Sequence, residues 1–120
     1  MRVLIAEDET IIRLDVRTLL EKAGHEVVAE ARDGEEAVAL ALEHRPDLIL
    51  MDLSLPLVDG WEATRRIKAN ATTSAIPVMA ITANAMSGDE DRARAAGCDD
   101  FMTKPVDEDL LFAKLQHWLG

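Results

Sequence analysis

The stretch Leu48-Ile49-Leu50-Met51-Asp52 is an apolar run of strand length that ends on a carboxylate. Two further runs are built in the same way, because Val3-Leu4-Ile5-Ala6 precedes Glu7 and Val78-Met79-Ala80-Ile81 precedes Thr82. Runs with almost no polar position are typical of strands buried on both faces of a parallel sheet. We therefore predict that these three segments form the centre of such a sheet.

Two further runs, of which the one at 101–102 is the weaker, are expected at the edges of the same sheet. Residues 27–29 and 101–102 are apolar but short, and charged residues flank both of them. Polar flanks are typical of edge strands, which must avoid pairing with other chains. With the three apolar runs in the middle, the sequence predicts the strand order 2-1-3-4-5, one of two common doubly wound arrangements.

Segments with helical periodicity separate these strands. The clearest one has an apolar stripe that is closed by a glycine: Ile12, Val16, Leu19, Leu20, Ala23 and Gly24. Three pairs have the spacing by which a side chain caps a helix start: Asp33 with Glu36, Asp59 with Glu62, and Ser87 with Glu90. The expected helices after the first are 34–44, 60–70, 87–96 and a last one from about Asp107. The predicted fold is therefore α/β, with a doubly wound five-stranded parallel sheet and five helices.

Length and composition restrict the class of protein further. The chain has 120 residues and a formal net charge of -10 at pH 7, so we expect one domain over 1–120, alone or within a longer protein. An acidic excess repels phosphate backbones and anionic lipids, so neither nucleic acid nor a membrane is an expected partner. No stretch approaches the roughly 20 apolar residues that a membrane span needs, and the start of the sequence does not resemble a secretory signal, so a cytoplasmic location is expected. The lone Cys98 cannot form an internal disulfide, so no oxidising compartment is required.

Polar side chains follow four of the five predicted strands. Glu7 and Asp8 come after the first, Asp52 ends the third, Thr82 follows the fourth, and Lys104 follows the fifth. In a doubly wound sheet, ligands bind beyond the carboxyl ends of the strands, where the strand order reverses. Neighbouring carboxylates repel each other unless a cation or proton intervenes, and oxygen ligands without His or Cys favour Mg²⁺. The set is therefore suited to phosphorylation of an aspartate beside a divalent ion.

Simpler interpretations exist for each residue taken alone. Acidic residues at a strand end often only cap the next helix, which applies most to Glu9 and less to Glu7 with Asp8. A single threonine or lysine at these positions is more often structural than functional. Asp52 is harder to explain in this way, because it ends an apolar strand and lies at the rim of the sheet.

Several motifs together resemble those of receiver domains of two-component response regulators, the CheY-like family. They are the stretches 3–9, 47–56, 59–60, 81–83, 96–101 and 103–105, which read VLIAEDE, DLILMDLSLP, DG, ITA, AGCDDF and TKP. The resemblance covers the whole chain. It implies a switch that takes its phosphoryl group from a histidine kinase or a histidine phosphotransfer protein, and that is no enzyme toward other substrates.

The resemblance also assigns roles to individual residues. It implies that Asp52 is the phosphoacceptor and that Thr82 and Lys104 contact the phosphoryl oxygens. Mg²⁺ would be held by Glu7, Asp8, Asp52 and the backbone carbonyl of Ser54. Thr82 and Phe101 would form the switch, and Pro105 would follow a cis peptide bond.

Separately from the resemblance, the helix near 87–96 offers the core only Ala93, Ala95, Ala96 and a few other small groups, so we expect it to be held weakly. We therefore expect a downstream protein to bind the face formed by the fourth helix, fifth strand and fifth helix.

Two departures from the family pattern affect these expectations. Glu7 stands where the family more often has Asp, which lengthens one arm of the metal site. Ser54 and Asn84 occupy positions that in this family tune the lifetime of the acyl phosphate.

Three other functions compete with the signalling interpretation. A haloacid-dehalogenase-type phosphatase needs a second aspartate two residues after the first as acid and base, but Ser54 stands there. A flavodoxin-like flavin carrier would hold phosphate in the loop after the first strand, where 7–9 are all acidic. A receiver that signals without phosphorylation remains the third alternative.

Overall fold

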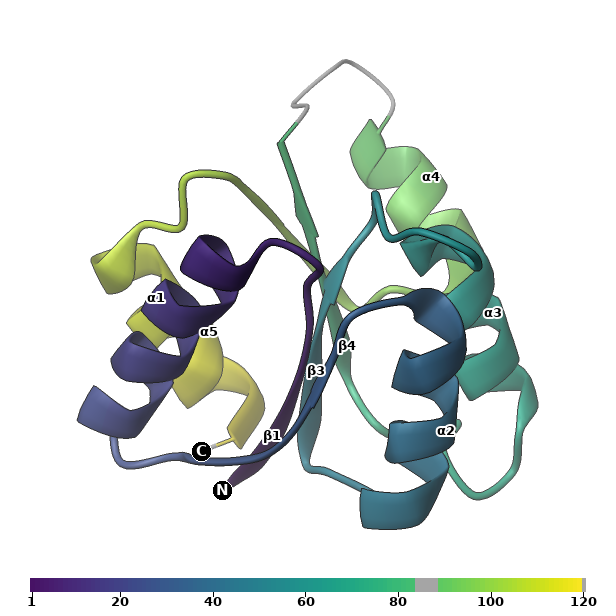
Figure 1. Ribbon diagram of the computed structural model, residues 1–120, viewed down its shortest axis with the longest axis horizontal. Helices are drawn as coiled ribbons and strands as arrows, with labels where there is room; N and C mark the ends of the chain where they lie inside the picture. Colours follow the sequence, from purple (N-terminus) through teal and green to yellow (C-terminus); the bar gives the residue numbers. More distant parts are fainter. Residues whose placement is uncertain (84–88, 120) are drawn as a thin grey trace.

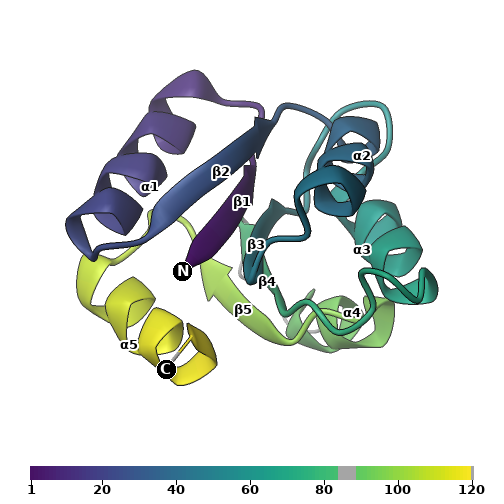
Figure 2. The same ribbon diagram turned by 90° about the horizontal axis from the view of Figure 1, so that it is seen from below.

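The computed structural model describes residues 1–83 and 89–119, in which strands and helices alternate along the chain. The strands are β1 (Arg2–Ala6), β2 (Glu26–Ala31), β3 (Leu48–Asp52), β4 (Val78–Thr82) and β5 (Asp100–Thr103). The helices are α1 (Thr10–Lys22), α2 (Gly34–His44), α3 (Gly60–Ala69), α4 (Asp89–Ala96) and α5 (Glu108–Leu119). The strands pair in parallel in the order β2-β1-β3-β4-β5 (Figure 2), which confirms the predicted fold and both edge strands.

Helices cover both faces of the sheet, so that two cores form. Helices α1 and α5 lie on one face, and α2, α3 and α4 lie on the other (Figure 1). Successive side chains of β1 point to opposite faces, as the pleat requires: Val3 and Ile5 join the α1–α5 core, and Leu4 and Ala6 join the other. Among the described helices, none has the length and apolar character needed to cross a bilayer.

The first helix ends where the sequence predicts, but its buried face differs from the predicted stripe. Gly24 has φ +88°, a left-handed conformation that suits glycine just after a helix end. The side chains that α1 buries are Arg13, Val16 and Leu20. Ala23, predicted as the last residue of the stripe, is exposed because the helix has already ended at Lys22.

Side-chain caps begin two of the other helices as predicted. The carboxylate of Asp33 accepts a hydrogen bond from the N–H of Glu36 at 2.8 Å, and that of Asp59 from the N–H of Glu62 at 2.9 Å. Both satisfy a backbone donor that has no partner within the helix. The proposed cap residue of α4, Ser87, lies outside the described residues.

Gly60 allows α3 to begin directly against the end of β3. A Cβ atom at this position would overlap the backbone of Asp52 and Leu53. The N–H of Gly60 also donates to the carbonyl of Leu53 at 3.2 Å. A side chain here would therefore push the start of α3 away from the strand that carries Asp52.

Candidate functional site

The predicted site residues meet at the carboxyl ends of four strands. Asp52 and Thr82 are the last residues of β3 and β4, and Glu7 and Lys104 directly follow β1 and β5. The side chains of Glu7, Asp52 and Thr82 are all buried, with relative exposures of 4%, 2% and 4%. Asp8 is exposed at the rim. The parallel sheet thus brings together residues that are far apart in the sequence.

Lys104 connects the two buried carboxylates. Its Nζ lies 2.6 Å from Oε1 of Glu7 and 3.3 Å from Oδ2 of Asp52. Burial alone would lower the pKa of Lys104, but the two carboxylates outweigh this effect and raise the pKa above its ordinary value. The lysine is therefore a fixed positive charge between the two acids.

Glu7 has an unusual environment for a carboxyl group. The pKa of Glu7 is raised to about 7, chiefly by burial, and the neighbouring Asp52 acts in the same direction. Hydrogen bonds from Lys104 and from the N–H of Glu9 lower the pKa, but they offset burial only in part. The site has more negative charge than one lysine neutralises, so it favours an additional proton or cation.

The acidic cluster fits a magnesium ion. One carboxylate oxygen from each of Glu7, Asp8 and Asp52 can be chosen so that all three lie within 4.8 Å of one another. Mg²⁺ prefers oxygen ligands and is usually bound by one or two carboxylates together with waters. The exposed position of Asp8 leaves the cluster open to solvent on one side.

The remaining expected site residues lie around Asp52. The N–H of Ser54 donates to Oδ1 of Asp52 at 3.1 Å, so that both oxygens of this carboxylate are oriented by hydrogen bonds. Phe101 is half-buried and packs against the core on the α2–α3–α4 face. The Lys104–Pro105 peptide is cis. The carbonyl role of Ser54 and the switch roles of Thr82 and Phe101 stay predictions, and Asn84 lies outside the described residues.

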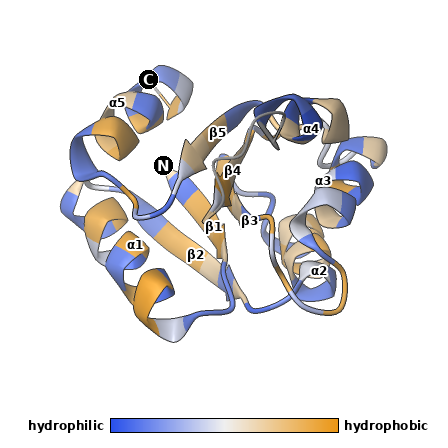
Figure 3. Cartoon of the chain, turned by 90° about the horizontal axis from the view of Figure 1, so that it is seen from above, coloured by the Kyte–Doolittle hydropathy of each residue, from blue (hydrophilic) through white to orange (hydrophobic). Residues whose placement is uncertain are grey.

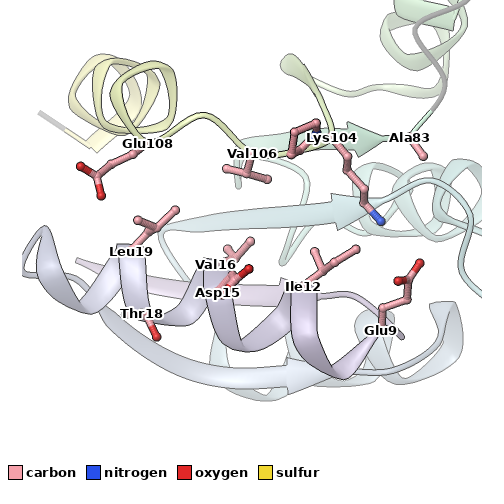
Figure 4. A pocket seen from close by; sticks show the side chains of 11 residues that line it. Glu9, Ile12, Asp15, Val16, Thr18, Leu19, Ala83, Lys104, Val106 and Glu108 are labelled. Atoms are coloured by element: carbon pink, nitrogen blue, oxygen red, sulfur yellow. The ribbon is translucent and has the colours of Figure 1, made fainter.

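A groove of about 640 Å³ adjoins the site between α1 and the segment after β5. Apolar side chains such as Ile12, Leu19 and Val106 line its length, and Glu9 and Lys104 lie at the end next to the carboxylates (Figure 4). A partner that fills this groove would therefore contact Lys104 directly.

One charged residue that touches the site, Arg13, was not predicted from the sequence. Arg13 is buried, and its Nη1 donates to the backbone carbonyl of Glu7 at 2.9 Å. The signal was present, since Arg13 precedes Val16 by three residues and Leu20 by seven, which places it on the apolar face of α1. An arginine at such a position indicates a buried polar partner.

Comparisons with known proteins all point to one protein family. Residues 3–116 match the response regulator receiver domain. The chain is 43% identical to the polar-differentiation response regulator DivK of Brucella anthropi over 118 residues, which cover 98% of this chain and 95% of DivK.

Solved structures agree with this match. The receiver domain of the sensor histidine kinase PA1611 from Pseudomonas aeruginosa superposes with a TM-score of 0.91 at 37% identity, covers 99% of this chain and 97% of its own, and has a magnesium ion coordinated in its active-site cleft. The chemotaxis protein CheY4 of Vibrio cholerae gives a TM-score of 0.89 at 29% identity and covers 98% and 97%. Receiver domains are phosphoacceptor signalling domains and not classical enzymes. The site geometry, the strand order and these matches together show that the chain belongs to the receiver domain family of two-component response regulators.

Proposed function

We propose that the chain, as one receiver unit over 1–120, is a phosphorylation-dependent switch with Asp52 as the phosphoacceptor. The observation that carries the proposal is the environment of this carboxylate, which is buried and held by Lys104 and by the N–H of Ser54. A carboxylate oriented in this way and next to two further acids is poised for reaction at a cation-bearing site.

The proposed reaction transfers a phosphoryl group from a phosphohistidine of a histidine kinase or phosphotransfer protein. A carboxylate oxygen of Asp52 forms a bond to phosphorus while the P–N bond breaks, and the imidazole nitrogen leaves with the bonding electron pair. Lys104 and Thr82 contact the phosphoryl oxygens. Glu7, Asp8, Asp52 and the Ser54 carbonyl would hold Mg²⁺, which when bound would supply positive charge to offset the charge on the transferring group.

We further propose that the face of α4, β5 and α5 contacts the downstream protein. Within residues 90–96 of α4, the buried side chains are only Ala93 and Ala96, so little apolar surface holds this helix in place. Phe101 of β5 is half-buried on the same face of the sheet as α4.

Intact-mass analysis after incubation with acetyl phosphate and Mg²⁺ tests the proposal. We expect a gain of one phosphate in the wild-type chain and none in Asp52→Asn, because the amide is not a nucleophile. The matched control is Asp91→Asn, which changes an exposed aspartate of α4 and should gain one phosphate like the wild type. Phosphorylation of Asp52→Asn, or steady hydrolysis of phosphate esters by the wild type, would contradict the proposal.

A further inference from the structure

Arg13 is the one buried arginine or lysine within residues 1–83 and 89–119, with a relative exposure of 8%. Burial of a guanidinium is costly unless its charge is paired and its N–H groups have acceptors. At its buried position behind Glu7, Arg13 therefore requires hydrogen-bond acceptors and a negative charge, and the structure provides both.

The first partner is the backbone of Glu7. Nη1 of Arg13 donates to the Glu7 carbonyl at 2.9 Å, and the Glu7 N–H donates to the carbonyl of Ala31 at 2.9 Å. Both polar groups of the Glu7 backbone are thus engaged. These two bonds fix the direction of the Cα–Cβ bond of Glu7, and from there the contacts with Lys104 and with the Glu9 N–H place the carboxylate.

The second partner is Glu30 of the edge strand β2. Nε of Arg13 lies 3.3 Å from Oε1 of Glu30, and Nη1 of Arg17 lies 2.6 Å from Oε2 of the same carboxylate. The two arginines of α1 therefore share one acid. They differ in one respect, because Arg17 pairs with Glu30 and Glu21, whereas Arg13 also donates to the Glu7 carbonyl.

We propose that Arg13 is a positioning residue for the divalent-cation site. It holds the Glu7 backbone so that this carboxylate faces those of Asp8 and Asp52, and Glu30 in turn fixes the orientation of the guanidinium. Groups that orient a metal ligand from behind commonly change metal affinity by tenfold to a hundredfold when they are altered. This inference rests on the proposed function of the acidic cluster as a Mg²⁺ site.

The test compares Arg13→Ala and Arg13→Lys with the control Arg17→Ala, and it measures Mg²⁺ binding by calorimetry at a temperature at which each chain is folded. We expect Mg²⁺ affinity about tenfold or more weaker in Arg13→Ala. The Mg²⁺ affinity of Arg13→Lys should be intermediate, because an ammonium group keeps the positive charge but cannot contact the Glu7 carbonyl and the Glu30 carboxylate at the same time, as a guanidinium does. Arg17→Ala should bind Mg²⁺ with an affinity within twofold of wild type, even though this variant also loses an ion pair to Glu30. If Arg13→Ala does not fold, Arg13→Lys carries the comparison.

A second measurement needs no metal. The N–H of Glu9 donates to Oε2 of Glu7 at 3.1 Å, so hydrogen exchange at the Glu9 amide reports on the position of that carboxylate. We expect faster exchange at Glu9 in Arg13→Lys but not in Arg17→Ala. Wild-type Mg²⁺ affinity and wild-type Glu9 exchange in the Arg13 variants would overturn the inference.

The same samples separate the inference from the proposed function. A wild-type chain that binds Mg²⁺ but gains no phosphate contradicts the proposed function and leaves the positioning role standing if the Arg13 variants bind weakly. A phosphorylated wild type whose Arg13 variants bind Mg²⁺ normally contradicts the positioning role alone. A wild-type chain that does not bind Mg²⁺ overturns both.

Discussion

Helices α1 and α4 each follow a strand that leads into the site, yet they are attached to the molecule in opposite ways. α1 buries Val16 and Leu20 in the core, and its Arg13 pairs with Glu30 on the neighbouring strand. In α4, the buried side chains among residues 90–96 are two alanines, and the helix is largely hydrophilic (Figure 3).

The difference in side-chain size implies a difference in attachment energy. Full burial of a Val or Leu side chain is worth roughly 1.5–3 kcal/mol, whereas a buried methyl group contributes about 0.8 kcal/mol. α1 is therefore anchored several times more strongly than α4. We therefore expect the metal-binding side of the site to be built on a firmly held helix, and the helix after β4 to move at lower cost.

The largest effect is expected when the buried leucine that attaches α1 to the core is removed. Leu20→Ala should lower the free energy of unfolding by about 3 kcal/mol, because Leu20 is fully buried and its loss leaves a cavity. Urea denaturation measures this change. The matched control is Leu14→Ala on the same helix, where the side chain is 54% exposed and the expected loss is within about 0.5 kcal/mol. Equal losses in the two variants would mean that the α1 core is not the anchor.

Helix α5, the second helix on the α1 face, is held by hydrogen bonds to a charged residue, whereas α4 is held by alanines. Asp100 accepts hydrogen bonds from Nζ of Lys114 at 2.6 Å and from Nε1 of Trp118 at 2.9 Å. Burial alone would raise the pKa of Asp100, but these bonds and the N–H of Phe101 outweigh it and hold the pKa below its ordinary value of 3.8. We expect Asp100→Asn to cost about 2 kcal/mol of unfolding free energy at neutral pH.

The pH dependence of this loss follows from the lowered pKa. The stabilisation by Asp100 is fully present above 3.8, where the group is ionised in both states, and it is lost as the pH falls through the lower folded pKa. Urea denaturation of both chains should therefore show the gap between wild type and Asp100→Asn closing below pH 3.8. Asp91→Asn, an exposed change in α4, should show neither the loss nor the pH dependence. A gap that persists unchanged in acid would exclude the ionised carboxylate as its cause.

Two glycine variants measure how much a buried methyl group stabilises α4. Ala95 is exposed and Ala93 is fully buried, so Ala95→Gly reports the backbone cost alone, about 1 kcal/mol. Ala93→Gly should add the lost methyl burial, up to about 0.8 kcal/mol more. Hydrogen exchange should show faster opening of α4 in both variants and unchanged protection in α1. Faster exchange in α1 as well would mean that the two helices open as one unit.

The convergence of the site was predictable from the sequence, whereas its inner contacts were not. Parallel strands end at one edge of a sheet, so Glu7, Asp52 and Lys104 had to lie near each other once the strands were assigned. The spacing of Arg13 along α1 signals its burial, but its partners were not predictable, because only the folded chain brings the loop after β1 and Glu30 of β2 next to it. The contact of Gly60 with β3 depends in the same way on how closely two distant elements approach.

The smallest expected effect concerns the one aromatic contact of α4 among the described residues. The guanidinium of Arg92 lies 4.6 Å from the ring centroid of Trp61, which follows the glycine packed against Asp52. A double-mutant cycle with Trp61→Leu and Arg92→Gln should give a coupling of about 0.5–1 kcal/mol in urea denaturation. Arg94→Gln, on the same helix but paired with Glu90, should show no coupling to Trp61. A coupling energy of this size is comparable to the free energy contributed by one of the buried methyl groups of α4. If no coupling is measured, the buried alanines remain the main attachment of α4 among the described residues.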